Sequence, residues 1–461
     1  MRRSLVIVAG LVLAACGGQS ATTASAPTAA ATPVTYPPAP EAPTGPNDEA
    51  TARFDEILAT IPAGAFDVRD VQEFIDVADA RHAWLLTDLL RFLSDENAVD
   101  ITVDGFTTLT GVEITDDPDV ARRPWNVTTN HLIVWDTPAP PDYRRLKGGL
   151  FGLVEDGWAP FFADADADID WRWVSWGGVF IDDRPLGDPN PCERPGCIPA
   201  LDDPALVPAA DGDWYDDAAI VFGVTEGDEA VALPKHMMQV HEMVNVTIGG
   251  RRFGIPYCTL CGSAQAFYTD DVPDEFDTPV LRTSGLLNRS NKVTYDLTTR
   301  SVFDTFTGEA VSGPLHDAGV VLEQNAVTVS TWGEWKAAHP GSTIVAEDGG
   351  IGRSYDDDPL GGRDDDGPIF PIGDVDPRLA VQAPVLGVLL DDGRTIAFSI
   401  DALRAATAEG GQVHYEDVTV TTDGGGFVAE ADGDEIGTHE AFWFAWSQFH
   451  PDTLLWPNDA N

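Results

Sequence analysis

The chain has few basic residues. Of its 461 residues, 27 are Lys or Arg and 76 are Asp or Glu, which gives a formal net charge of −49. A surface of this sign repels the phosphates of nucleic acids and the head groups of anionic lipids. We therefore exclude both as partners. We interpret the charge as a solvated acidic shell, as in proteins of salty habitats, rather than as a store for cations.

The sequence also lacks long apolar runs and several familiar catalytic motifs. No stretch beyond residue 16 approaches the ~20 apolar residues that a membrane-spanning helix needs. There is no G-x-S-x-G elbow, no glycine-rich phosphate loop and no H-E-x-x-H zinc motif. Hydrolase and nucleotide-binding functions therefore have no support in the sequence.

The N-terminus predicts export. "MRRSLVIVAGLVLAACGG" joins two arginines to a short apolar run and small residues, the pattern of a signal peptide over residues 1–15. The stretch "LAAC" resembles a bacterial lipobox. We therefore expect Cys16 to be lipidated and the protein to be extracytoplasmic, attached to the cell membrane by this anchor alone. The alternative is an ordinary secretory signal followed by a chance cysteine.

Cysteines are scarce, and their spacing is informative. Of the five in the chain, Cys16 is the predicted lipidation site, which leaves Cys192-x4-Cys197 and Cys258-x2-Cys261. An even number in an oxidising compartment is compatible with two disulfides. A bridge between Cys192 and Cys197 crosses a Pro-Gly turn easily, and we predict that disulfide. A bridge within Cys258-x2-Cys261 is tighter, and tight bridges are more easily reduced.

The pattern of apolar residues predicts a β-rich α+β fold. Residues such as Phe54, Ile57, Val71 and Phe74 recur at helical spacing, whereas later segments are short and strand-like, including "HLIVWD" and "AIVFGV". The expected order is a signal peptide (1–15), a disordered Ala/Thr/Pro tether (16–47), a small helical module (48–95), a β-rich connecting region (96–196), a first repeat with the Cys-x-x-Cys site (197–346) and a second repeat as scaffold (347–461).

An internal repeat supports two related β-rich half-domains. "AIVFGVTEGDEAVALPKHMM" at 219–238 aligns with "APVLGVLLDDGRTIAFSIDAL" at 383–403, each with V-x-G-V, an acidic turn and an apolar strand. Both copies end in W-x3-H-P, at Trp335 and at Trp446. Two half-domains of related topology would account for this pattern. The Cys-x-x-Cys segment falls within the first copy, where we expect the chemistry.

The strongest cluster of reactive side chains runs from residue 234 to residue 263. A hairpin "VNVTIGGRRFGIPY" would bring His241 and Glu242 back beside Cys258 and Cys261. We predict a thiol redox site in which one cysteine attacks, the other resolves, and His241 and Glu242 tune the thiolate. "CGSAQAFYTD" predicts a turn entering another strand, unlike the helix of thioredoxin-like proteins.

Two other functions remain open for the same segment. The first is a copper(I) or zinc site, because sulfur and imidazole are ligands that these metals prefer. Its ligands would be Cys258, Cys261 and His241, with Met237 or His316 completing the shell. The second is a non-catalytic surface module in which the cysteine pair only staples the chain.

Several segments together resemble a known family. They include "HEMVN", "PYCTLCGSAQAF", "SGLLNRSNKVTYDLTTRSVFDTFTGEAVSGPL" and "TWGEWKAAHPGS". With their neighbours they resemble, over about residues 197–456, the bacterial family catalogued as domain of unknown function 3179. The resemblance implies a secreted or membrane-attached protein, and the selenoproteins among its members imply redox chemistry. The residues that carry over are His241, Glu242, Cys258, Cys261, Gly262 and Ser263.

These observations favour a cell-surface lipoprotein with a thiol-based redox site. Its partner would be a protein or a small-molecule thiol. Cys192 and Cys197 do not match the family pattern, and "LPK" at 233–235 departs from it, so His236 and the neighbouring methionines are interpreted as local additions.

Overall fold

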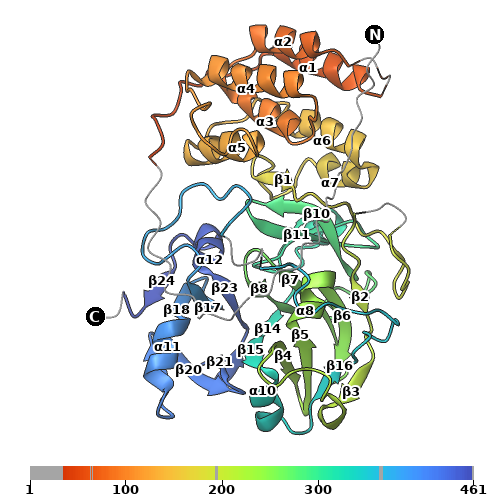
Figure 1. Cartoon of the computed structure of the whole chain (residues 1–461), viewed down its shortest axis with the longest axis vertical. Helices are drawn as coiled ribbons and strands as arrows, with labels where there is room; N and C mark the ends of the chain where they lie inside the picture. The colour runs from red at the N-terminus through yellow and green to blue at the C-terminus, as the bar shows by residue number, and fades with distance from the viewer. Residues whose placement is uncertain (1–34, 63, 65, 193–195, 363–366, 459–461) are drawn as a thin grey trace. The chain divides into compact units, whose positions relative to one another are not determined.

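The structure is a computed structural model, and it describes residues 35–458 apart from 63, 65, 193–195 and 363–366. The fold is β-rich α+β, with a helical region in the N-terminal part of the sequence and five sheets (Figure 1). The chain divides into two compact units. We call residues 1–179, 287–289 and 370–374 the helical unit and the remainder the β unit. The predicted signal peptide and Cys16 lie outside the described residues.

The helical unit is built from amphipathic helices whose apolar faces meet. Asp67 is the N-cap of the helix that begins at Val68, because its side chain accepts a hydrogen bond from the backbone N–H of Arg69. Phe54 and Phe74 are fully buried and pack edge to face. The elements are α1 (Asp48–Thr60), α2 (Val68–Val77), α3 (Ala83–Leu90), α4 (Glu96–Thr110), α5 (Pro124–Val134), α6 (Tyr143–Val154), α7 (Ala159–Ala163) and β1 (Val174–Trp176), with 3₁₀ turns at Ala80–His82 and Asp156–Trp158.

The expectation that residues 96–196 form a β-rich connection is wrong for its first two thirds. Helices continue to Ala163, and "HLIVWD" belongs to α5 and the turn after it. A short apolar run does not distinguish a buried helix from a strand. In α4 the β-branched residues disfavour a helix only weakly, and burial outweighs them. At Gly105 in this helix, a Cβ would lie 2.4 Å from the end of the Ile75 side chain, so any larger residue would force that side chain to move.

Of the predicted tether, only residues 35–47 lie within the described part of the chain. They have no regular secondary structure, and they contact the helices of their own unit. The Trp135 indole N–H donates to the Pro37 carbonyl at 2.7 Å, and Arg81 donates to the Gly45 carbonyl at 2.6 Å. Tyr36 packs edge to face on His131. A single aromatic side chain and exposed carbonyls are enough to dock a segment whose composition indicates disorder.

The β unit contains the Cys-x-x-Cys segment in its largest sheet. Its strands in spatial order are β14 (Gln324–Asn325), β9 (Ala266–Tyr268), β7 (Arg251–Cys258), β6 (Met243–Ile248) and β2 (Leu201–Asp202), with β8 (Ser263–Ala264) on β7. The β6–β7 hairpin turns at Gly249–Gly250 as predicted, and Met243 pairs with Pro256. The turn after Cys258 enters β8, so the expected strand is confirmed.

The remaining strands of the described residues belong to four further sheets. The second sheet is β15 (Thr328–Thr331), β4 (Ile220–Glu226), β5 (Glu229–Pro234), β16 (Thr343–Val345) and β3 (Leu206–Pro208). A third contains β10 (Leu281–Asn288), β11 (Asn291–Asp296), β12 (Val302–Asp304) and β13 (Ala310–Ser312). The fourth sheet consists of β23 (Thr438–Phe442), β17 (Pro384–Leu389), β18 (Thr395–Ser399) and β24 (Leu454–Trp456). The fifth sheet consists of β19 (Val413–Tyr415), β20 (Val418–Asp423), β21 (Gly426–Ala431) and β22 (Asp434–Ile436).

Short helices follow several of these strands. They are α8 (Lys235–His241), α9 (Pro314–Asp317), α10 (Trp332–Ala338), α11 (Ile400–Thr407) and α12 (Trp443–Phe449), with a 3₁₀ turn at Ala209–Asp211.

The two segments of the sequence repeat form sheets with the same strand pairing. β15–β4–β5–β16 and β23–β17–β18–β24 each contain two antiparallel pairings and one parallel pairing in the same order. In both, the glycine of V-x-G-V faces the tryptophan of W-x3-H-P, Gly223 against Trp335 and Gly387 against Trp446. The division of the chain into two half-domains stays a prediction.

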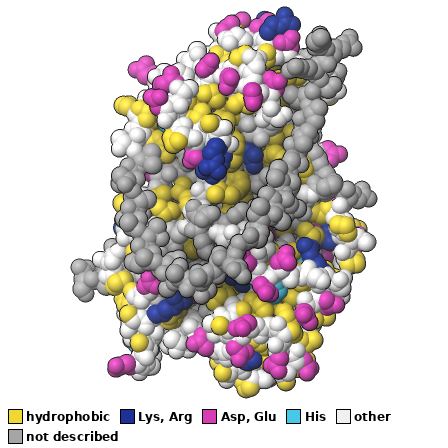
Figure 2. Space-filling view, in the orientation of Figure 1, with side chains coloured by type: hydrophobic (Ala, Val, Ile, Leu, Met, Phe, Trp, Pro, Cys, Tyr) yellow, Lys and Arg dark blue, Asp and Glu magenta, His cyan; other side chains and the backbone are white. Residues whose placement is uncertain are grey.

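The acidic composition is visible on the surface. Figure 2 shows Asp and Glu side chains spread over the visible face of the described residues, whereas Lys and Arg form a few separate patches. Among the described residues, no helix combines the length and the apolar character needed to cross a bilayer.

Candidate functional site

The two cysteines of the Cys-x-x-Cys segment lie in a tight turn. Cys258 ends β7, and the backbone N–H of Cys261 donates to the Cys258 carbonyl at 3.2 Å. Gly262 follows with φ of +61°, and a Cβ there would lie 3.1 Å from the Phe442 ring. The turn brings the two sulfurs to 2.8 Å, and both cysteines are free and buried. This is a dithiol whose sulfurs are already in contact.

The environment makes the two thiols unequal. Burial raises the pKa of Cys258, but a hydrogen bond from Cys261 and the neighbouring Lys292 lower it, and the net shift of the pKa is downward. Burial raises the pKa of Cys261 well above its usual value, and the neighbouring Cys258 adds to the rise. Both sulfurs face the Ser290 carbonyl, at 3.8 Å from Cys258 and 3.2 Å from Cys261. The opposite directions of the two pKa shifts favour ionisation of Cys258 over Cys261.

A buried ion pair lies beside the dithiol. The Lys292 ammonium contacts a Glu242 carboxylate oxygen at 2.6 Å and donates to the Glu242 carbonyl at 2.8 Å. Glu242 ends α8 in the left-handed region, with φ of +52°. The hydrogen bond from the Tyr257 N–H to the Glu242 carbonyl, at 3.0 Å, connects it to the end of β7. The hairpin thus places Glu242 near the cysteines as expected.

Lys292 is a residue of the candidate site that the spacing of motifs did not identify. It lies on β11, in the segment "NRSNKVTYD" that resembles the family. No local pattern distinguishes this lysine from a surface lysine, because its burial depends on pairing with Glu242, a residue 50 positions earlier.

His241 precedes Glu242 but faces a different part of the molecule. Its Nδ1 lies 2.7 Å from the Pro199 carbonyl, which requires the proton on Nδ1, and its Nε2 accepts from the Tyr355 hydroxyl at 2.8 Å. Burial lowers the pKa of His241 to about 4. Both ring nitrogens are thus engaged by groups other than the thiols, and the imidazole lines a cleft instead.

The residues of the predicted copper or zinc site lie in different surroundings. Met237 is buried in the apolar core of the β unit, and His316 lies on α9. Among the described residues, neither His241 nor His316 groups with the two thiols as a set of three ligands. The structure groups three other side chains, Asp182, Cys192 and Cys197, whose ligand atoms lie within 4.8 Å of one another.

Cys192 and Cys197 are joined by a disulfide near a buried carboxylate. Asp182 is fully buried, and its carboxylate forms ion pairs with Arg184 at 2.7 Å and with Arg282 at 3.7 Å. The backbone N–H of Ala200 donates to Oδ2 of the Asp182 carboxylate at 2.8 Å. The cysteine pair is compatible with redox chemistry or, once reduced, with binding a metal ion together with Asp182.

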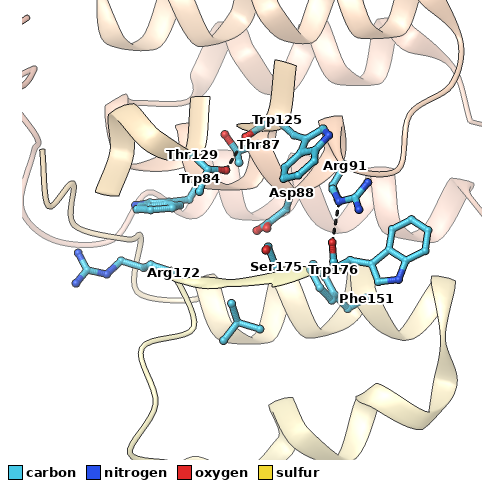
Figure 3. Close-up of a pocket in the computed structure, with 11 residues that line it drawn as sticks. Trp84, Thr87, Asp88, Arg91, Trp125, Thr129, Phe151, Arg172, Ser175 and Trp176 are labelled. Atoms are coloured by element: carbon cyan, nitrogen blue, oxygen red, sulfur yellow. Dashed lines mark hydrogen bonds between the residues drawn. The ribbon is translucent and has the colours of Figure 1, made fainter. Parts of the chain in front are cut away.

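Several polar groups line a small hollow in the helical unit, and the Ser175 hydroxyl among them has no hydrogen-bond partner in the described part of the chain. The volume of the hollow is about 10 Å³. Figure 3 shows Arg91 beside Trp176, whose carbonyl accepts from the guanidinium Nε at 2.8 Å. Burial lowers the pKa of Arg91 to about 10. Nearby, Asp88 pairs with Lys147 at 2.9 Å in the core. We interpret this cluster as structural.

The fold and this site define a β-rich α+β protein with a buried Cys-x-x-Cys dithiol. The chain belongs to the family described as protein of unknown function DUF3179, whose sequence model matches residues 195–432. The match includes Cys197, Cys258 and Cys261 and begins after Cys192. Comparison with curated proteins and with solved structures gives no match.

Proposed function

We propose that this protein is a thiol-based redox protein in which Cys258 attacks and Cys261 resolves. The contact between the two sulfurs, at 2.8 Å, is the observation that carries the proposal. The opposite shifts of the two pKa values support the division of roles, because the thiolate is the attacking form. Lys292 stabilises the Cys258 thiolate, and Glu242 holds Lys292 in place.

The reaction is an exchange between the dithiol and a partner disulfide. The Cys258 thiolate attacks one sulfur of the partner, which forms a mixed disulfide and releases the other partner sulfur as a thiolate. The Cys261 thiol then loses its proton and attacks the Cys258 sulfur, which releases the second partner thiolate. The protein dithiol is oxidised to a disulfide, and the partner disulfide is reduced by two electrons to two thiols, which take up the two protons.

Burial limits which partners fit this site. The exposed fraction is 4% for Cys258 and 0% for Cys261. Attack on a disulfide needs a straight approach to the sulfur, which a protein partner would not achieve at a buried turn. The partner that suits this site is a small-molecule disulfide.

The test is to trap the intermediate. We expect Cys261→Ser, treated with glutathione disulfide, to retain a mixed disulfide at Cys258, because the resolving thiol is missing. Cys258→Ser should form far less adduct, because the Cys261 thiol resists ionisation. Mass spectrometry of the intact protein and of its peptides measures both. Circular dichroism verifies that each variant is folded. Equal adducts in the two folded variants, or none in either, would contradict the proposal.

A second candidate is a metal site at Asp182, Cys192 and Cys197. The closeness of their ligand atoms favours it, and two thiolates with a carboxylate form a donor set that zinc accepts. The disulfide must first be reduced. Native mass spectrometry of the reduced protein with zinc should show one bound ion, lost in Cys192→Ser. Zinc bound equally by that variant would contradict this site.

We also propose that the protein is an extracytoplasmic lipoprotein. The support is the lipobox-like "LAAC" that ends at Cys16. Cys16→Ala should move the protein from the membrane fraction to the soluble fraction of expressing cells. Recovery of this variant with the membrane in the same proportion as the native sequence would contradict a lipid anchor.

A further inference from the structure

A cleft in the β unit is lined by residues other than the two dithiol cysteines. It has a volume of about 240 Å³, slightly smaller than the ~300–1,000 Å³ of sites for drug-sized ligands. One wall comes from residues 187–191, which lead into the Cys192–Cys197 disulfide, and another comes from residues 351–353. The size suits a ligand of a few carbon atoms.

Most of the cleft is apolar. Six of its lining residues offer carbon surface: Pro189, Pro191, Pro199, Ala200, Leu201 and Ile351. His241 lines it as well, but its two nitrogens are engaged by Pro199 and Tyr355. Because the Tyr355 pKa is raised to about 12, chiefly by burial, its hydroxyl keeps its proton and continues to donate to the imidazole.

Of the two arginines in the lining, Arg184 has no donor left for a ligand. Its guanidinium donates to both carboxylate oxygens of Asp182, at 2.7 and 3.0 Å. The remaining donors reach the carbonyls of Asp188, Asn190 and Ala200 at 2.7, 3.1 and 2.8 Å. These five bonds use every N–H of the side chain. Arg184 therefore shapes the cleft and holds residues 188–190 in position.

Arg353 differs from Arg184 in this respect. In the part of the chain that the structure describes, its guanidinium has neither a carboxylate partner nor a hydrogen-bond acceptor, and it lies 5.5 Å from the centre of the Tyr355 ring. It is exposed at the edge of the cleft. In a chain with 76 acidic and 27 basic residues, a guanidinium without a carboxylate partner is notable. Its planar fork matches a carboxylate in two-point geometry.

We propose that this cleft binds a small organic carboxylate, with the carboxylate on Arg353 and a short apolar body against the proline-lined wall. Arg353 supplies the charge and the direction, and the carbon surface of Leu201 and Ile351 supplies the contact area. The proposal goes beyond the redox function and is independent of it, because no step involves Cys258 or Cys261.

The experiment measures binding of hexanoate, acetate and inorganic phosphate to the purified full chain by isothermal titration calorimetry. We expect hexanoate to bind with one site and to bind tighter than acetate, because each additional methylene that is buried strengthens binding by roughly fourfold. Phosphate should bind more weakly than hexanoate, because it has no apolar body. Arg353→Gln should weaken hexanoate binding by about tenfold or more, the loss expected for a charged hydrogen bond.

Two further variants make the result specific. Arg353→Lys should retain part of the affinity, since it keeps the charge and loses the fork. Arg394→Gln, at an arginine paired with Asp392 and Asp417 elsewhere in the β unit, should leave hexanoate affinity unchanged. No saturable binding of hexanoate, equal binding by Arg353→Gln, or tighter binding of phosphate than of hexanoate would each overturn the proposal. Redox exchange at Cys258 is measured separately and does not enter this result.

Discussion

At the scale of single residues, Lys292 and Glu242 act on the dithiol with opposite signs. Lys292 lowers the pKa of Cys258, and Glu242, which pairs with Lys292, raises it. The two charges therefore shift the pKa of Cys258 in opposite directions. Removing Lys292 should raise this pKa and removing Glu242 should lower it, whereas a merely structural role predicts no such difference in sign.

We expect Lys292→Met to move the pH midpoint of Cys258 alkylation upward, because the thiolate loses its nearest cation and retains Glu242. Glu242→Gln should move it downward. The pH dependence of the iodoacetamide rate, measured on Cys197→Ser/Cys192→Ser protein, reports the midpoint.

Lys336→Met, which removes a lysine paired with Asp217 in the same unit, serves as the control. Breaking a buried ion pair costs about 3–5 kcal/mol of stability, so folding is verified by circular dichroism at each pH. A midpoint that moves in the same direction in both variants would refute the electrostatic account.

Buried histidines give a second residue-scale effect. Burial lowers the pKa of His450 to about 4 from the ordinary value of 6.5, and its Nε2 has no hydrogen-bond partner among the described groups. Between these two values the unfolded chain binds more protons than the folded chain. The free energy of unfolding therefore falls as the pH falls from 6.5 toward 4, and His450 contributes nothing to this slope well above pH 6.5.

We expect His450→Phe to reduce the slope of unfolding free energy against pH by about 1.4 kcal/mol per pH unit between about pH 6 and pH 5. The phenyl ring replaces an imidazole that packs on Trp446 with ring centres 4.2 Å apart. Urea unfolding followed by tryptophan fluorescence gives the slope. His414→Phe, at an exposed histidine on β19, is the comparison. An unchanged slope in His450→Phe would show that this histidine is not buried in its neutral form.

At the scale of elements, the two sheets of the repeat depend on a glycine facing a tryptophan. A Cβ at Gly387 on β17 would collide with the Trp446 ring. The strand therefore lies closer to α12 than any other residue would allow. The same relation holds between Gly223 on β4 and Trp335 on α10.

We expect Gly387→Ala to lower the free energy of unfolding by about 1–3 kcal/mol, the usual cost of overpacking a core. Gly341→Ala provides the matched comparison, because an added Cβ there meets no atom within 4 Å. Urea titration measures both. If the two variants lose the same small amount, the close approach of strand and tryptophan does not govern stability.

The elements that the sequence predicted correctly share a clear local signal. β4, β6, β17 and β18 all alternate or run apolar between glycine or acidic turns. Helices α4 and α5 lack that clarity, because Thr, Val and Ile occur in both states and their burial against other helices decides the outcome.

In the candidate site, the sequence predicts contacts between residues that are close along the chain but not contacts between distant ones. The hairpin that returns Glu242 to Cys258 is encoded locally by Gly249–Gly250. The direction of the His241 ring is not, because it depends on Pro199 and on Tyr355, which is 114 positions away. Contacts across such distances leave no periodic trace in one sequence, and for that reason Lys292 and Arg353 were not identified.

At the scale of the whole molecule, the dominant feature is repulsion between acidic groups. The chain has 76 acidic and 27 basic residues, and repulsion among the unbalanced negative charges disfavours a compact state. Ion pairs such as Arg145–Asp55 and Arg394–Asp417 are exposed, and exposed pairs contribute at most about 1 kcal/mol each. Salt weakens both the repulsion and these pairs, so the sign of its effect reveals which of them is larger.

We expect the thermal unfolding midpoint to rise between about 0.1 M and 1 M KCl, where the Debye length falls from ~10 Å to ~3 Å. The reason is that 49 uncompensated negative charges outnumber the exposed pairs that salt would weaken. Differential scanning calorimetry in KCl, with sucrose as an uncharged stabiliser for comparison, separates screening from solvent exclusion. A midpoint that falls with KCl while it rises with sucrose would mean that specific ion pairs, rather than a solvated acidic shell, determine stability.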